Sequence, residues 1–213
     1  MKAELVIWGA GGHAKVVFDT AAALGYSRVR FVDDCAHQLP ELYGCEITAP
    51  SVDTQVSGRT VDFIVAVGDN RSRSRCYSRG LQQGWNPVTL IHPSAEVSPH
   101  SEISAGCAVL PRAVINAGAV IGPNCIINTG AIVEHDCRID CHAHISPSAT
   151  LGGNAQVGAF AHVGIGACVL PGCGIGAGSI VGAGAVVLTS IPEGVTAVGV
   201  PARILSLSKA GAR

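Results

Sequence analysis

The feature that most constrains the fold is a six-residue repeat that runs without interruption through the second half of the chain. An aliphatic residue recurs at every sixth position, and a small residue precedes each of them by two positions. The aliphatic positions are Val97, Ile103, Val109, Ile115, Ile121, Ile127, Val133, Ile139, Ile145, Leu151, Val157, Val163, Val169, Ile175, Val181 and Val187. The small positions are Ala95, Ser101, Cys107, Ala113, Ala119, Cys125, Ala131, Cys137, Ala143, Ala149, Ala155, Ala161, Ala167, Cys173, Ser179 and Ala185.

A period of six fits neither the 3.6-residue helix nor a long alternating strand. It is typical of a short strand and a turn repeated around a solenoid. Side chains two apart in a strand share a face, so both columns are expected to point inward. Four of the nine cysteines occupy the small column, where a thiol acts as a compact buried hydrophobe. We therefore expect no chemistry from these four.

Aromatic residues mark a domain boundary. Both Trp, all three Tyr and three of the four Phe precede residue 92, and only Phe160 follows it. The change falls at IHPSA, residues 91–95. The sequence therefore predicts one domain over residues 1–92 and a solenoid with a C-terminal tail over residues 93–213.

The first domain is predicted to be an α/β, Rossmann-like unit. Strands are expected at residues 4–8, 29–34 and 61–70, with an amphipathic helix at residues 14–25. The loop between the first strand and the helix, GAGGH, loosely matches the phosphate-binding turn of nucleotide-binding folds, and Asp33 and Asp34 end the next strand where ribose-binding acids lie. About 90 residues leave room for one mononucleotide unit rather than a full dinucleotide fold. The alternative is a structural glycine turn that packs helix on strand.

The bulk composition excludes several classes of function. The formal net charge is -1 and no long basic run is present, so neither nucleic acid nor an anionic membrane is an expected partner. No apolar run approaches the roughly 20 residues of a membrane span, and the N-terminus lacks the pattern of a secretory signal. Nine cysteines without paired spacing indicate reduced thiols, so we expect a cytoplasmic protein.

The repeat resembles that of the hexapeptide-repeat acyltransferases. The resemblance implies a left-handed parallel β-helix with three hexads, or 18 residues, per coil, an exception to the usual crossover hand. It also implies homotrimers with sites between neighbouring subunits. On such a coil His135 projects from an edge, with Gly153 one coil onward and Asp136 beside it. His144 points outward from the face opposite that edge, and His162 stacks above it.

A zinc site is a rival interpretation of these histidines. The stretch from Cys137 to His144 contains two Cys and two His, and γ-class carbonic anhydrases share the helix and bind zinc between subunits. Against it, Cys137 is expected to point into the core, and the spacing is not a standard zinc pattern. A further rival is a hexapeptide scaffold that binds nucleotide sugars or proteins without turning them over.

The whole chain, from about residue 4 to 205, resembles the nucleotide-amino-sugar N-acetyltransferases and the closely similar sialic acid O-acetyltransferases. The matching segments are GAGGH at 9–13, the acid pair at 33–34, VGDN at 67–70, IHPSA, INTGAIVEHDC at 127–137, His144, and GVPAR at 199–203. The resemblance implies transfer of an acetyl group from acetyl-CoA to the amine of a nucleotide-linked sugar, with O-acetylation as the alternative.

The resemblance also implies roles for individual residues. His135 would be the general base, Asp136 its orienting acid, and the Gly153 backbone N–H the donor to the thioester oxygen. Acetyl-CoA would be bound by Gly153, His162, Gly164 and the His144 of a neighbouring subunit. The nucleotide sugar would be bound by a set from the first domain: Gly9, Gly11, Gly12, His13, Asp33, Asp34, Gly68 and Asn70.

Overall fold

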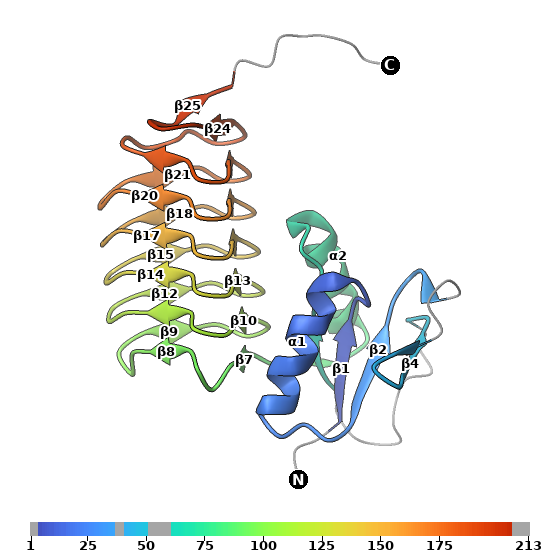
Figure 1. The fold of residues 1–213 in the computed structure, drawn as a ribbon. Coiled ribbons are helices and arrows are strands. Elements are labelled where there is room, and N and C mark those ends of the chain that lie inside the picture. The colour runs from blue at the N-terminus through green and yellow to red at the C-terminus, as the bar shows by residue number, and fades with distance from the viewer. Residues whose placement is uncertain (1–3, 37–40, 51–60, 206–213) are drawn as a thin grey trace, which may run out of the picture.

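The computed structural model describes residues 4–36, 41–50 and 61–205, in which an α/β domain packs beside a three-sided, left-handed parallel β-helix (Figure 1). The predicted fold class is confirmed. Neither of the two helices in these residues has the length and hydrophobicity that a membrane span requires.

The N-terminal domain is a six-stranded sheet between two helices. In sheet order its strands are β3 (Glu41–Leu42), β4 (Cys45–Thr48), β2 (Val29–Val32), β1 (Leu5–Trp8), β5 (Asp62–Val65) and β6 (Asn86–Pro87). All neighbours are parallel except the β3–β4 hairpin. Helix α1 (Gly12–Ala23) packs on one face, and α2 (Asn70–Gln82) packs on the other.

The structure differs from the sequence prediction at residues 66–82. The third predicted strand, 61–70, ends at Val65, and α2 begins at Asn70. Asp69 caps this helix, since its carboxylate accepts a hydrogen bond from the Ser72 N–H at 2.8 Å. The helix is rich in Arg and Ser and has few apolar residues. It forms because one face packs against the sheet through Cys76 and Tyr77.

Three parallel sheets form the sides of the β-helix. The first comprises β7 (Leu90–Ile91), β10 (Ala108–Val109), β13 (Ile126–Ile127), β16 (His144–Ile145), β19 (His162–Val163), β22 (Ile180–Val181), β24 (Thr196–Val198) and the antiparallel β25 (Arg203–Ile204). The second comprises β8 (Glu96–Val97), β11 (Val114–Ile115), β14 (Ile132–Val133), β17 (Thr150–Leu151), β20 (Cys168–Val169) and β23 (Val186–Val187). The third comprises β9 (Glu102–Ile103), β12 (Val120–Ile121), β15 (Arg138–Ile139), β18 (Gln156–Val157) and β21 (Gly174–Ile175).

The coil length is 18 residues, as the resemblance implied. Val114 pairs with Ile132, and Ile132 pairs with Thr150. Both repeat columns form one continuous core, and all four column cysteines are buried and unpaired. The first hexads, at the open end, are only partly buried because no coil covers them from below. The predicted inward orientation of both columns is confirmed.

The two domains meet where α1 and α2 contact the β-helix. Strand β7 pairs with β10, so the β-helix begins at Leu90, slightly before the predicted boundary at residues 92 and 93. Leu90, Ala108 and Leu110 share one apolar cluster with Ala14 and Val17 of α1. Residues 206–213 of the predicted C-terminal tail lie outside the described residues.

The small column gives a first testable prediction. Ala155→Leu adds three carbons at a fully buried position, where neighbouring coils leave no room. We expect a loss of about 1–3 kcal/mol in the free energy of unfolding, measured by denaturant titration. Gln156→Leu is the matched control, because the neighbouring side chain is exposed and points outward. Equal stability of the two variants would contradict the assignment of inward and outward positions.

Candidate active site

His135 and Asp136 form a hydrogen-bonded pair at an exposed edge of the β-helix. The corner between β14 and β15 carries both residues, and Asp136 turns the chain with a φ of 60°. His135 Nδ1 lies 2.9 Å from Asp136 Oδ2. Because a carboxylate only accepts, Nδ1 donates and Nε2 keeps a free lone pair. The side chains are 62% and 66% exposed, so this lone pair is open to solvent.

Gly153 lies one coil above this histidine, in contact with its ring. A Cβ at residue 153 would approach Cε1 and Nε2 of His135 to 2.6 Å, so only glycine leaves the ring in place. The Gly153 carbonyl accepts from the Gly172 N–H, whereas the Gly153 N–H has no partner within the described part of the chain. The edge therefore presents a proton acceptor and a free backbone donor side by side.

The pKa of His135 is raised, chiefly by its hydrogen bond to Asp136. The charges of Asp136 and Glu134 add to this effect, and partial desolvation opposes it. An imidazole with a raised pKa is a stronger base once deprotonated, which suits it to accept a proton from an amine.

A second glycine, which the sequence analysis did not identify, leaves room for the Asp136 carboxylate. Gly118 lies one coil before Asp136, and a Cβ there would collide with the Asp136 carboxylate. The 18-residue register that located Gly153 could also have located Gly118.

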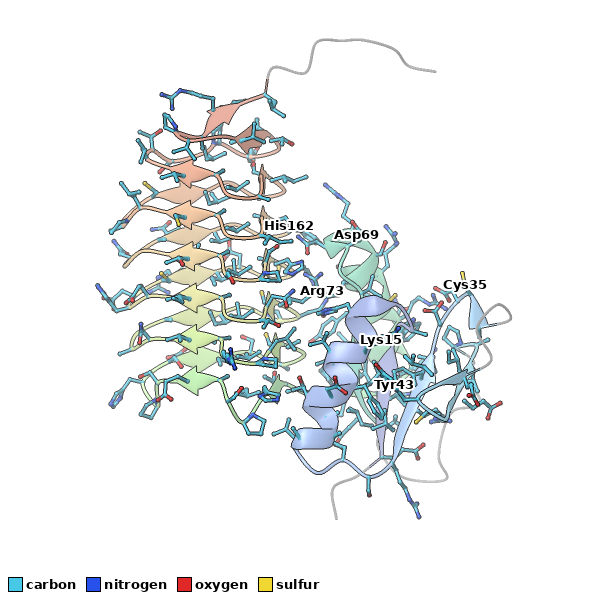
Figure 2. All side chains as sticks on the ribbon, in the orientation of Figure 1. Lys15, Cys35, Tyr43, Asp69, Arg73 and His162 are labelled. Atoms are coloured by element: carbon cyan, nitrogen blue, oxygen red, sulfur yellow. The ribbon has the colours of Figure 1, made fainter. Side chains whose placement is uncertain are left out.

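A pocket of about 330 Å³ lies between the start of α2 and the first sheet of the β-helix. Its lining residues are Gly68, Asp69, Asn70, Arg71, Phe160, His162, Gly178 and Ile180. The structure thus brings together Gly68 and Asn70, predicted to bind the nucleotide sugar, with His162, predicted to bind acetyl-CoA. In Figure 2, Asp69 and His162 approach each other across the gap between the two domains.

His144 points outward from its sheet, as predicted, but the N-terminal domain covers it, so only 7% of it is exposed. Its ring packs against His162 at 4.7 Å and lies 6.4 Å from His13 of α1. Asn128 Nδ2 lies 3.0 Å from its Nε2, and its Nδ1 has no partner among the described residues. Burial, followed by the charges of His162, Arg73 and His13, lowers the pKa of His144 to about 3.

His13 lies on α1 beside His144 and is largely buried. Burial and, to a smaller extent, the charge of Arg73 lower its pKa to about 4. Its Nε2 has no hydrogen-bond partner among the described residues. Both His13 and His144 are therefore neutral at pH 7, and Nε2 of His13 is free for a polar group of a ligand.

The glycines of the GAGGH loop differ from one another. Gly9 has a φ of +114°, and a Cβ there would lie 2.9 Å from the Ala66 carbonyl, so strand packing alone requires glycine at this position. Gly11 and Gly12 have open space where a Cβ would be. The structural interpretation of the loop therefore accounts for Gly9, and the predicted ligand role stays open for the other two.

The acid pair is engaged within the protein. Asp33 accepts the Ala10 N–H at 2.9 Å and the Cys35 N–H at 2.8 Å, so it fixes the glycine loop to the end of β2. Asp34 forms an ion pair with Arg79 at 2.9 Å, and this guanidinium stacks 4.8 Å above the Trp8 ring. Asp33 thus has a structural task that the sequence analysis did not anticipate.

Gly164 also has a structural explanation. It is buried, and a Cβ there would come within 2.5 Å of the Val181 carbonyl in the next coil. Close stacking of coils requires this glycine, and no contact of the residue itself points to acetyl-CoA. The predicted orientation of Cys137 is confirmed, since it is fully buried, and no cluster of three metal-ligating side chains occurs within residues 4–36, 41–50 and 61–205.

Comparison with known proteins connects both parts of the molecule to one family. Residues 4–79 match the family model described as the PglD N-terminal domain. A mutant of perosamine N-acetyltransferase from Caulobacter crescentus, solved with CoA and GDP-perosamine, is 40% identical, with a TM-score of 0.91. The match covers 96% of this chain and 97% of that chain.

Two further structures show the same likeness over nearly full length. The acetyltransferase domain of PglB from Neisseria gonorrhoeae, in complex with acetyl coenzyme A, is 40% identical, covering 95% of this chain and 98% of that one, with a TM-score of 0.90. WeeI from Acinetobacter baumannii is 27% identical, covering 95% and 99%, with a TM-score of 0.86. With this identity and coverage, and with both domains matched, the chain belongs to the hexapeptide-repeat sugar acetyltransferases.

Proposed function

We propose that the protein is an acetyl-CoA-dependent N-acetyltransferase that acts on the amino group of a nucleotide-linked amino sugar. The observation that supports it most directly is the His135–Asp136 pair facing the free Gly153 N–H, in a chain 40% identical to a GDP-perosamine N-acetyltransferase. No corresponding observation favours the O-acetyltransferase, zinc-enzyme or scaffold alternatives.

The geometry supports a simple order of steps. The neutral sugar amine attacks the thioester carbonyl of acetyl-CoA, and a tetrahedral intermediate forms. His135 Nε2 accepts the proton that the amine nitrogen sheds, while Asp136 stabilises the resulting imidazolium. The Gly153 N–H donates to the oxyanion. Collapse of the intermediate expels the CoA thiolate and leaves the acetylated amine.

A complete site on this scheme needs two subunits, and we infer a homotrimer. Within one chain, His135 lies at a corner between the second and third sheets, whereas His144 and His162 lie on the first sheet. The second sheet turns apolar side chains outward at Val114, Ile132 and Val186. Leu170 and Leu188, two and three coils above Glu134 on the same corner, are 39% and 48% exposed. These surfaces suit contact with a second copy, and light scattering measures the mass of the assembly.

We further infer that the protein works in the cytoplasm. All nine cysteines are free thiols, including the exposed Cys35 and Cys168, which is typical of a reducing compartment.

The test of the proposed function is thiol release from acetyl-CoA in the presence of amino sugars linked to GDP, UDP, dTDP or CMP. The expected product is one nucleotide sugar that gains a single acetyl group on its amine, identified by mass spectrometry and NMR. Thiol release without such a product, or no release with any amine-bearing nucleotide sugar, would contradict the proposal. The deaminated, hydroxyl-bearing sugar is the matched control for N- against O-acetylation.

The raised pKa of His135 predicts how the reaction depends on pH. The base works only when deprotonated, so kcat/KM should rise through the His135 pKa and reach a plateau above it. Asp136→Asn removes the main cause of the raised pKa, so the rising limb should move to lower pH and the plateau should fall because the tautomer is no longer fixed. The measurement is kcat/KM from about pH 5 to 9, the range in which an imidazole titrates. If the rising limb of kcat/KM stays at the same pH in Asp136→Asn, His135 is not the base that this limb reports.

A further inference from the structure

Arg73 of α2 is a fully buried guanidinium that is hydrogen-bonded almost entirely to backbone carbonyls. It is 1% exposed, and no ion pair joins it to a carboxylate in the described residues. Burial lowers its pKa to about 10, so it stays charged at neutral pH. Its acceptors are Asn124 O at 3.0 Å, Val67 O and Gly68 O at 3.1 Å, Asn70 Oδ1 and His142 O at 2.7 Å, and Ala143 O at 3.2 Å.

These acceptors belong to both domains. Val67 and Gly68 precede α2 in the N-terminal domain, whereas Asn124 and His142 occupy one corner column of the β-helix, 18 residues apart. Figure 2 shows Arg73 at the junction between the helices and the coils. A charged group pulled out of water is costly unless its donors are satisfied, and here carbonyls from both sides of the junction satisfy them.

Asn70 extends the same contact by one coil. Its amide donates to Phe160 O at 2.9 Å and to Ala161 O at 3.1 Å, while its oxygen accepts from Arg73. Residues 124, 142 and 160 all have left-handed backbone conformations, with φ of 56° to 60°. Arg73 and Asn70 therefore bond to three successive corners. The Asn70 amide is fully used in this way, which gives it a task other than the predicted contact with substrate.

The contact fixes the part of the N-terminal domain that lines the pocket. Arg73 holds the carbonyls of Val67 and Gly68 directly, and Asn70 begins α2 beside them. His144 and His162 lie on the strands that follow the bonded corners at residues 142 and 160. The same bonds thus determine where residues 67 and 68 lie relative to His144 and His162.

We propose that Arg73, assisted by Asn70, is a positioning residue that holds the nucleotide-sugar domain in the register on the β-helix that acetyl transfer requires. This inference rests on the proposed function. The residue touches no reacting atom on this scheme. A shift of about 1 Å in the placement of a substrate can cost a hundredfold in rate, so loss of register should act on kcat rather than on binding of either ligand.

The test compares Arg73→Met with Arg75→Met, the same change on an exposed residue of the same helix, and with Arg73→Lys as a partial rescue. We expect Arg73→Met to lower kcat by at least about tenfold, while calorimetric affinities for acetyl-CoA and for the free nucleoside diphosphate stay within about twofold. Arg73→Lys should recover part of the rate, and Arg75→Met should match the wild type. Wild-type kcat in Arg73→Met, or a loss of nucleotide affinity as large as the loss of rate, would overturn the proposal.

Two further measurements keep the test decisive. If Arg73→Met does not fold, Asn70→Ala keeps the guanidinium and removes only the bonds at residues 160 and 161, and it should show a smaller loss of kcat with unchanged affinities. Scanning calorimetry gives a readout without activity: the unfolding transition of Arg73→Met should move to lower temperature, whereas that of Arg75→Met should stay at the wild-type value. If the wild type acetylates no nucleotide sugar, the proposed function is wrong. If Arg73→Met unfolds at the wild-type temperature, the inference that Arg73 holds the two domains together is wrong.

Discussion

His135→Ala should lower kcat by roughly 10²–10⁴, the range that a positioned general base contributes. The imidazole is exposed, so its removal leaves no cavity and the thermal midpoint should stay at the wild-type value. The affinity for acetyl-CoA should also be retained, because the Gly153 N–H and the groove around it remain. Steady-state kinetics with the nucleotide sugar that the wild type acetylates measure kcat. Calorimetric titration with acetyl-CoA measures its affinity.

The matched control is His100→Ala, which removes another exposed histidine of a β-helix corner. It should leave kcat unchanged. Near-normal turnover in His135→Ala would show that the amine loses its proton to another group. A large loss of acetyl-CoA affinity would instead make His135 a binding residue.

Gly153→Ala keeps the backbone N–H but should lower kcat by up to about 10²–10³, the loss expected if the oxyanion can no longer reach this donor. The added Cβ would lie 2.6 Å from Nε2 and Cε1 of His135, so it displaces the base and narrows the approach to the backbone N–H together. The fold should tolerate the change, because Ala117 occupies the equivalent corner position two coils earlier without disturbing it.

Kinetics and the thermal midpoint of Gly153→Ala separate an effect on catalysis from an effect on the stability of the fold. A double variant with His135→Ala should lose little more than the worse of the two single variants, since both act on one proton-transfer and oxyanion unit. Fully additive losses would place Gly153 and His135 in separate functions. A lowered thermal midpoint that accounts for the lost activity would make Gly153 a residue of the coil stacking alone.

The sequence by itself determined the β-helix and the catalytic edge. Small and aliphatic columns specify which side chains point inward, because side-chain direction in a short strand is set locally. Together with the 18-residue coil of the resembling family, this places residues 135 and 153 one above the other, and Asp136 is adjacent in sequence. The strands β1 and β2 and the helix α1 were likewise predictable from local patterns.

The tertiary structure alone decided what happens where the two domains meet. Helix α2 has few apolar residues, so its existence depends on packing. The bonds of Arg73 to three carbonyls of the β-helix have no signature in sequence. Docking of the N-terminal domain also buries His144. The repeat correctly predicted that this side chain points outward from its sheet, but it carries no information about the domain that covers it. The repeat specifies each coil from within, whereas the position of one domain on another depends on contacts between residues far apart in the chain, which follow no period.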